Sequence, residues 1–295
     1  MSNEQLVVIT AHYSLTTKKG VFAMTELRVK PKIDVAFKKI FSENLDLLKS
    51  LVSAALGFEA KDVTLCPNEI LPNEVEHKFC RLDLRIKVDE QEIDIEIQCY
   101  KRDDFQARAE YYSSLMFTRL HKGENYAKIP KTVLINIVDY PVFECQNYHS
   151  VFMNMEICRH ELLSDKKVIH FFELGKIPSL ENSKSNIELW LNLISADSEE
   201  KIAALESVSV SEIKKAVDEV RRLNRDPNFI RTTEARENAL REELSALSAA
   251  HDAGHKEGRQ EEKFDIAGNM LNENMPFDII EKLTGLSVKE IESLI

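Results

Sequence analysis

Two short segments of the sequence carry acidic side chains at spacings that could bind a metal ion. Apolar and polar residues alternate over 81–88, where Asp83 is on the polar side, and over 93–98, where Glu96 and Gln98 are on the polar side. Strict alternation predicts two β-strands, and the polar residues between them predict the turn of a hairpin. Carboxylate oxygens are the ligands that Mg²⁺ prefers, so the hairpin indicates a site for phosphodiester hydrolysis.

The register of the hairpin decides which of these groups meet. If the turn comprises residues 89–92, Asp83 lies opposite Gln98 and Arg85 lies opposite Glu96. Asp83 and Glu96 are then diagonal neighbours about 7 to 8 Å apart on one face, close enough to share a cation. The alternative is an ordinary solvated face on which Arg85 and Glu96 form a simple cross-strand ion pair.

Composition favours a soluble protein of two folded units. The chain has 295 residues, 43% of them hydrophobic, which is enough to bury a sizeable core. No run approaches the roughly 20 apolar residues that cross a bilayer, and the first residues do not resemble a secretion signal, so we expect a cytoplasmic protein that avoids membranes. The five cysteines form no CxxC pair, which argues against a zinc site or a disulfide framework.

The net charge of −11 argues against a nucleic-acid partner unless it is unevenly distributed. It is uneven: residues 197–295 carry 14 Lys and Arg against 22 Asp and Glu, whereas residues 81–131 carry 10 of each. The segment with the candidate acids is therefore neutral overall.

The segments on either side of the hairpin predict helices that pack near it. We expect residues 1–28 to be a flexible extension, with Met24 as a possible internal start, and the folded part to begin at Pro31 with one or two amphipathic helices. Asp34 falls in the first turn of this region, four residues before Lys38. Compensation of the helix dipole explains Asp34 as well as a role in the site does.

After the hairpin, Asp103 and Gln106 have the spacing of a capping box, which predicts a helix to about residue 121. Its apolar face includes Arg108 beside Tyr112. A guanidinium on such a face needs an anionic partner, which would be Glu96 or a substrate phosphate, unless the side chain extends to water. Buried strands are predicted at 132–138 and 168–174, which completes the outline of an α/β sandwich with a mixed sheet.

Six pieces of this region, in order, resemble the transposase-like PD-(D/E)XK nucleases of the recombination-promoting group. They cover about residues 31–180 and read DVAFKKIF, RLDLRIK, DIEIQ, RAEYYSSLMF, GENY and HFFELGK. The resemblance implies a restriction-endonuclease-like core, with a mixed sheet flanked by helices, that cuts DNA with Mg²⁺ or, as a substitute, Mn²⁺.

The resemblance also implies roles for individual residues. Asp83, Glu96 and the carbonyl of Ile97 would bind the metal ion, and Gln98 stands where the wider superfamily usually has a lysine. A neutral amide can hydrogen-bond to the attacking water but cannot supply the charge of an ammonium group. Less directly, the likeness extends to one acid of the first helix and to two residues of the helix that flanks the site: Asp34, Arg108 and Tyr112.

The remaining third of the chain differs in kind. We expect a nuclease-like domain over 29–196 and an all-α region over 197–295 that forms homo-oligomers or binds a partner. Two short helices over 276–295 resemble a helix-turn-helix, but Lys289 is the only base that the second one offers, so docking is favoured over DNA binding. Besides a DNA endonuclease, the sequence leaves open an inactive nuclease-derived binding module and a helical scaffold.

Overall fold

The structure is a computed structural model, and it describes residues 25–70, 80–89, 91–118 and 123–295. The chain divides into two compact units, the first ending at Ile230 and the second covering Arg231–Ile295. Each unit is described by itself.

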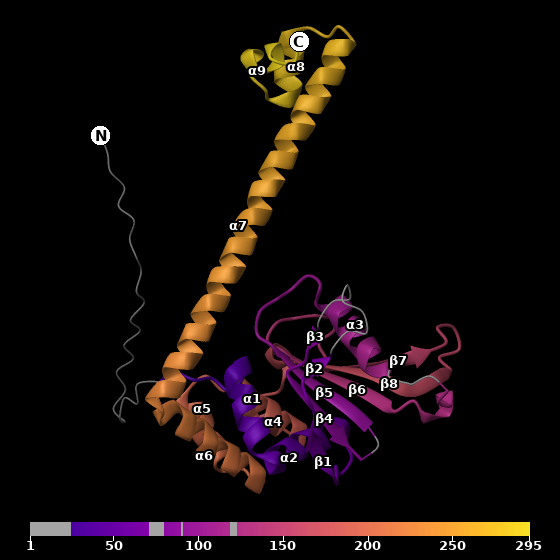
Figure 1. Ribbon diagram of the computed structural model, residues 1–295. Coiled ribbons are helices and arrows are strands. Elements are labelled where there is room, and N and C mark those ends of the chain that lie inside the picture. Colours follow the sequence, from indigo (N-terminus) through magenta and orange to yellow (C-terminus); the bar gives the residue numbers. More distant parts are fainter. Residues whose placement is uncertain (1–24, 71–79, 90, 119–122) are drawn as a thin grey trace. The chain divides into compact units, whose positions relative to one another are not determined.

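The first unit is built on a six-stranded sheet (Figure 1). Its strand order is β1-β4-β5-β6-β8-β7. The central strands β5, β6 and β8 are parallel, whereas β1, β4 and β7 pair antiparallel with their neighbours. The strands are β1 (Val63–Leu65), β2 (Glu69–Ile70), β3 (Cys80–Arg81), β4 (Leu84–Val88), β5 (Gln91–Gln98), β6 (Lys131–Val138), β7 (His149–Met155) and β8 (Leu162–Glu173), of which β2 and β3 form a separate ribbon.

Helices cover both faces of this sheet. One face carries α1, α2, α4 and α6, which bury the larger apolar core with Ile93, Ile95 and Ile97 of β5. The other face carries α3, which packs on β6 and β8 over a smaller core. The helices of this unit are α1 (Asp34–Glu43), α2 (Leu45–Leu56), α3 (Phe105–Phe117), α4 (Asn186–Ser195), α5 (Glu199–Leu205) and α6 (Ser211–Arg225), with single 3₁₀ turns η1 (Tyr126–Lys128), η2 (Leu174–Lys176) and η3 (Leu180–Asn182).

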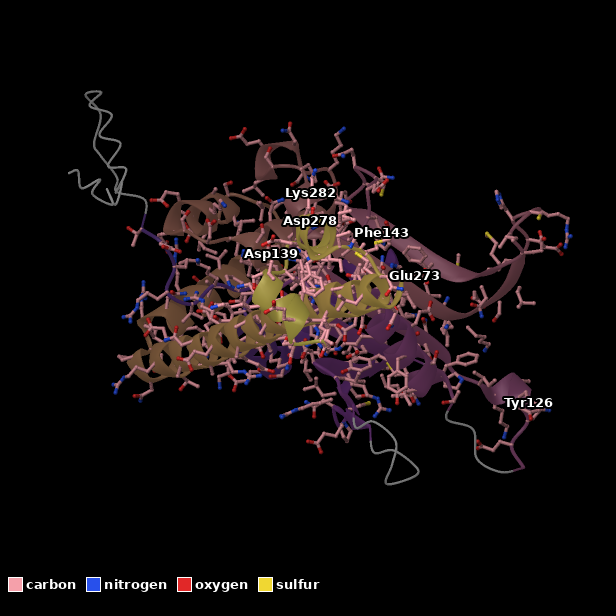
Figure 2. The ribbon with its side chains drawn as sticks, turned by 90° about the horizontal axis from the view of Figure 1, so that it is seen from above. Tyr126, Asp139, Phe143, Glu273, Asp278 and Lys282 are labelled. Atoms are coloured by element: carbon pink, nitrogen blue, oxygen red, sulfur yellow. The ribbon has the colours of Figure 1, made fainter. Side chains whose placement is uncertain are left out.

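Helix α1 forms because its apolar residues recur at helical spacing. Phe37, Ile40 and Phe41 are almost completely buried, and the Phe41 ring lies 5.6 Å from that of Trp190 in α4. Burial of such large side chains stabilises the fold by about 1.5–3 kcal/mol each and fixes α1 against the sheet. Short loop elements lie outside this core: Tyr126 of η1 points into solvent (Figure 2).

The expected fold class is confirmed: a mixed sheet with flanking helices, followed by a helical C-terminal region. The strand predicted at 132–138 is β6, and the one predicted at 168–174 is the second half of the longer β8. The predicted capping box of α3 is wrong, because the helix begins at Phe105 after Asp104, whose carboxylate instead binds Arg102.

The first unit extends beyond the 196/197 boundary that we expected. Asn224 of α6 accepts a hydrogen bond from the Val29 amide at 3.0 Å and donates one to the Val29 carbonyl at 2.8 Å. Residues 25–28 are not a free extension either, because Glu26 bridges Ser198 and Leu27 is buried. The rest of the expected extension, residues 1–24, lies outside the described residues.

The second unit contains most of a long helix and two short ones: α7 (Pro227–Asn272), α8 (Phe277–Thr284) and α9 (Val288–Glu292). Helix α7, with 46 residues, is the longest element of the all-α region that we expected over 197–295. Ile280 and Ile291 belong to a small buried core at its end. Gly285 turns the chain between α8 and α9 with φ of 71°. Among the described helices of both units, none is long and apolar enough to cross a membrane.

Candidate functional site

The β4–β5 hairpin has a different register from the predicted one. Val88 pairs with Gln91 and Leu84 pairs with Ile95, so β5 begins within the segment that we expected to be the turn. Asp89 adopts φ of 51°, the left-handed conformation that a tight hairpin turn requires. The register shifts by two residues, and this brings Asp83 opposite Glu96 instead of Gln98.

The same shift rules out an ion pair between Arg85 and Glu96. The Arg85 guanidinium lies 2.9 Å from the Glu92 carboxylate and donates to the Pro67 carbonyl at 3.1 Å. Its backbone partner on β5 is Asp94. The simple cross-strand pair that would have explained the polar face is therefore absent from this face, and Glu96 has other partners.

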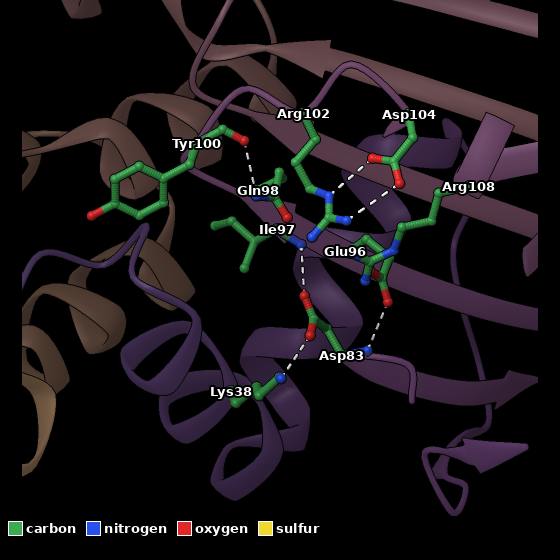
Figure 3. Close-up of polar contacts among 9 residues, drawn as sticks. All are labelled: Lys38, Asp83, Glu96, Ile97, Gln98, Tyr100, Arg102, Asp104 and Arg108. Carbon is green, nitrogen blue, oxygen red and sulfur yellow. Dashed lines mark hydrogen bonds and ion pairs between the residues drawn. The ribbon is translucent and has the colours of Figure 1, made fainter. Parts of the chain in front are cut away.

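Asp83 lies at a bend just before β4. Leu82 packs in the core beneath α3, whereas Leu84 packs in the larger core on the opposite face, so the alternation breaks at Asp83. The break leaves the Asp83 amide directed at β5, where it donates to Glu96 Oε1 at 2.9 Å. In return, the Ile97 amide donates to Asp83 Oδ2 at 3.0 Å (Figure 3). The two acids therefore lie side by side, held by reciprocal backbone hydrogen bonds.

Two cations from different helices approach these acids. Lys38 Nζ of α1 lies 2.6 Å from Asp83 Oδ1, and Arg108 Nη2 of α3 lies 3.2 Å from Glu96 Oε2 (Figure 3). The guanidinium of Arg108 also stacks over the Tyr112 ring, 4.7 Å from its centroid. Of the two partners considered for Arg108, Glu96 is the one that the structure shows.

Burial makes Glu96 an unusual acid. Only 4% of the residue is exposed, and burial followed by the neighbouring Asp83 carboxylate raises the pKa of Glu96 to about 7. The charge of Arg108, the Asp83 amide and the charge of Lys38 oppose this rise in pKa without cancelling it. Near neutral pH, Glu96 therefore exchanges its proton readily, and a second cation close to it would favour the ionised form.

Asp94 is a member of this cluster that the sequence prediction missed. It is fully buried on β5, two residues before Glu96, and neither of its carboxyl oxygens accepts a hydrogen bond from a described donor. Burial, then the charges of Glu96 and Asp83, raise the pKa of Asp94 well above its usual value. The signal was present in the alternation, which places Asp94 on the same side of the strand as Glu96.

Two protein-family models match the chain. Residues 31–250 match the model of the PD-(D/E)XK nuclease family transposases. The chain belongs to this nuclease family. Residues 260–295 match the C-terminal helix-turn-helix domain of the Rpn/YhgA-like nuclease family. No curated protein and no solved structure matches the chain.

Glu96-Ile97-Gln98 is the triplet that the resemblance led us to expect as the (D/E)XK element. The Gln98 amide nitrogen donates to the Tyr100 carbonyl at 2.9 Å, so this donor is used locally (Figure 3). Asp34 is likewise engaged at its own helix, where Oδ1 accepts from the Val35 amide at 2.8 Å. Arg108 therefore contacts Glu96 directly and Tyr112 contacts the Arg108 guanidinium, whereas the Gln98 amide nitrogen and Asp34 Oδ1 bond to backbone groups next to them in the chain.

The donor set suits a hard cation. The amide of Ile97 faces Asp83, and because N–H and C=O of one strand residue point to the same edge, its carbonyl faces that side too. Two carboxylates and one carbonyl match the oxygen ligands of Mg²⁺, which binds one or two carboxylates and keeps several waters. Within the described part of the chain, no three acidic, His or Cys side chains group as a complete metal site.

Proposed function

We propose that this nuclease-family protein is a metal-dependent DNA endonuclease that hydrolyses phosphodiester bonds. The observation that carries the proposal is the pairing of Asp83 with Glu96 through the Asp83 and Ile97 amides. Two acids held side by side in a largely buried setting repel each other, and a divalent cation between them relieves that repulsion.

The chain offers a role for each residue at the site. Asp83, Glu96 and the Ile97 carbonyl would hold Mg²⁺, or Mn²⁺ in its place. Such an ion supplies charge neutralisation at the scissile phosphate and lowers the pKa of the attacking water. Arg108 fixes the rotamer of Glu96, since its guanidinium contacts both the carboxylate and the ring of Tyr112.

Cleavage of supercoiled plasmid, titrated with Mg²⁺, tests this function. We expect metal-dependent nicking by the natural protein and a loss of at least about 10²-fold in Glu96→Ala and Asp83→Asn, because each removes a charge that holds the ion. Glu110→Gln is the matched control, since Glu110 is an exposed acid of α3 that pairs with Lys167. Undiminished nicking by Glu96→Ala would reject the assignment.

A second candidate is a binding module of the same fold without turnover. It is favoured by the cations already in place, because Lys38 and Arg108 neutralise both acids in the metal-free protein. This candidate predicts that the protein binds DNA but does not cleave it when Mg²⁺ or Mn²⁺ is added. The plasmid assay therefore separates it from the endonuclease.

We further propose that the protein acts in the cytoplasm and self-associates through its C-terminal helices. Self-association is supported by the solvated α7 and by the exposed apolar side chains of Ile279 and Leu283 in α8. Exposed apolar surface of this kind favours contact with another protein. Light scattering on the full chain measures the mass, and a monomer at all concentrations would contradict the association.

A further inference from the structure

Lys38 lies on helix α1, outside the sheet, and its ammonium group contacts one of the two acids. It belongs to α1, whose Phe37, Ile40 and Phe41 are buried in the larger core, so its backbone is fixed relative to β5. Its ammonium lies 2.6 Å from Asp83 Oδ1 while 31% of the side chain remains exposed. A ligand arriving from solvent at Asp83 therefore meets Lys38 as well.

Strand β5 has no cationic side chain beside Glu96. Gln98 follows Glu96 on β5 as a neutral amide, and its nitrogen donates to the Tyr100 carbonyl. Hydrolysis of a phosphodiester increases the negative charge on the phosphate oxygens in the transition state, where an ammonium group stabilises more strongly than an amide.

Arg108 is the other cation at the acids, but it is held more firmly. Its guanidinium contacts both Glu96 and the ring of Tyr112. Among the described residues, Lys38 has Asp83 as its one ion-pair partner. A second cation on Asp83 Oδ1 would repel the ammonium, so Lys38 must turn away from that oxygen when the site is loaded. An incoming phosphate then offers the Lys38 ammonium a new anionic partner.

We propose that Lys38 is a catalytic residue that contacts the scissile phosphate and neutralises its developing charge, in place of a cation on the strand. This inference rests on the proposed endonuclease function. In the reaction, the water oxygen forms a new bond to phosphorus while the bond to the leaving oxygen breaks. The water loses one proton to solvent, the leaving oxygen takes one from solvent, and Lys38 keeps its own protons throughout.

Steady-state cleavage by Lys38→Met in the full chain tests the role. We expect kcat to fall by about 10²-fold or more, with KM within about threefold of the natural value, because the lost contact strengthens in the transition state. The matched control is Lys39→Met, which removes the adjacent lysine of α1 that pairs with Glu43. It should cleave like the natural protein.

A second-site variant tests whether Lys38 acts through its charge or only by positioning Asp83. Gln98→Lys introduced into Lys38→Met should restore at least about a tenth of the natural kcat, because it returns an ammonium to the neighbourhood of the same acids. Calorimetric titration with Mg²⁺ in the absence of DNA should show equal or tighter binding by Lys38→Met, since a competing cation has gone. Thermal unfolding of each variant confirms that it is folded.

The outcomes distinguish the two proposals. A natural protein that cleaves nothing with Mg²⁺ or Mn²⁺ overturns both. Cleavage by the natural protein together with undiminished cleavage by Lys38→Met overturns the role of Lys38 alone. Weaker Mg²⁺ binding by Lys38→Met, or no recovery with Gln98→Lys, assigns Lys38 to positioning Asp83 and also overturns it.

Discussion

Glu96 couples the candidate site to the stability of the protein. Its pKa of about 7 lies above the ordinary 4.5, so between these values the folded protein holds a proton that the unfolded chain has released. The free energy of unfolding therefore falls as the pH rises from about 4.5 to about 7. Ionised Glu96 is thus a cost to the metal-free fold, of the order of 3 kcal/mol at most.

This coupling predicts that Glu96→Gln stabilises the metal-free protein at pH 8 while changing it little at pH 4.5. The amide oxygen of Gln can still accept the Asp83 amide, and the ionisation cost is removed. Urea unfolding at the two pH values measures the difference. A variant that is less stable than the natural protein at pH 8 would contradict the raised pKa; residual pH dependence is expected from Asp94, whose pKa is also raised.

At the same scale, the sequence predicted the two principal acids but not their partners. Asp83 and Glu96 were predictable because alternation in each arm is a local property. Asp94 was missed because the pattern cannot distinguish a solvated acid from one buried without a donor. Lys38 was expected to pair along its own helix, and the observed pair with Asp83 depends on how α1 packs against the sheet.

Among the elements, strands were easier to predict than the pairing between them. The buried strand over 132–138 was found from its β-branched composition, but the hairpin register depended on a tight turn at Asp89 that composition did not reveal. Strand β7 was not predicted, because its residues are half-buried or exposed and show no alternation. A capping box does occur at the start of α9, where it joins Ser287 and Glu290.

The small core of the second unit makes a prediction at this scale. Ile280→Ala should cost about 2–5 kcal/mol, because Ile280 is fully buried, and so few apolar residues share this core that the loss should unfold α8 and α9. Hydrogen exchange should then show loss of amide protection in these helices with the first unit unchanged.

The control for this experiment lies in the same helix. Leu283→Ala removes a side chain that is 63% exposed, and it should leave exchange nearly unchanged. Equal effects of the two variants would show that Ile280 is not the buried anchor of the unit.

For the whole molecule, charge distribution decides where DNA can bind. The segment that matches the helix-turn-helix domain carries three lysines against eight acidic residues over 260–295. DNA phosphates are attracted by bases and repelled by acids, so this composition predicts weak DNA binding by the segment itself. The candidate site, by contrast, has Lys38, Arg102 and Arg108 in its surroundings (Figure 3).

This contrast predicts which bases matter for binding. Arg102→Glu in the full chain should weaken duplex DNA binding several-fold and reduce the salt dependence, whereas Lys289→Glu should change affinity by less than about twofold. Fluorescence anisotropy at several salt concentrations, with Ca²⁺ in place of Mg²⁺ to prevent turnover, measures both. A larger effect of Lys289→Glu would assign DNA binding to the C-terminal segment.

The two hydrogen bonds between Val29 and Asn224 have a consequence for how the protein folds during its synthesis. They join residues 195 positions apart, and they secure the chain just ahead of α1. A ribosome releases the N-terminal residues first, so these two hydrogen bonds form only after nearly the whole first unit has emerged. A nascent chain that stops short of α6 should therefore lack them, and the segment just ahead of α1 should stay unsecured until α6 is made.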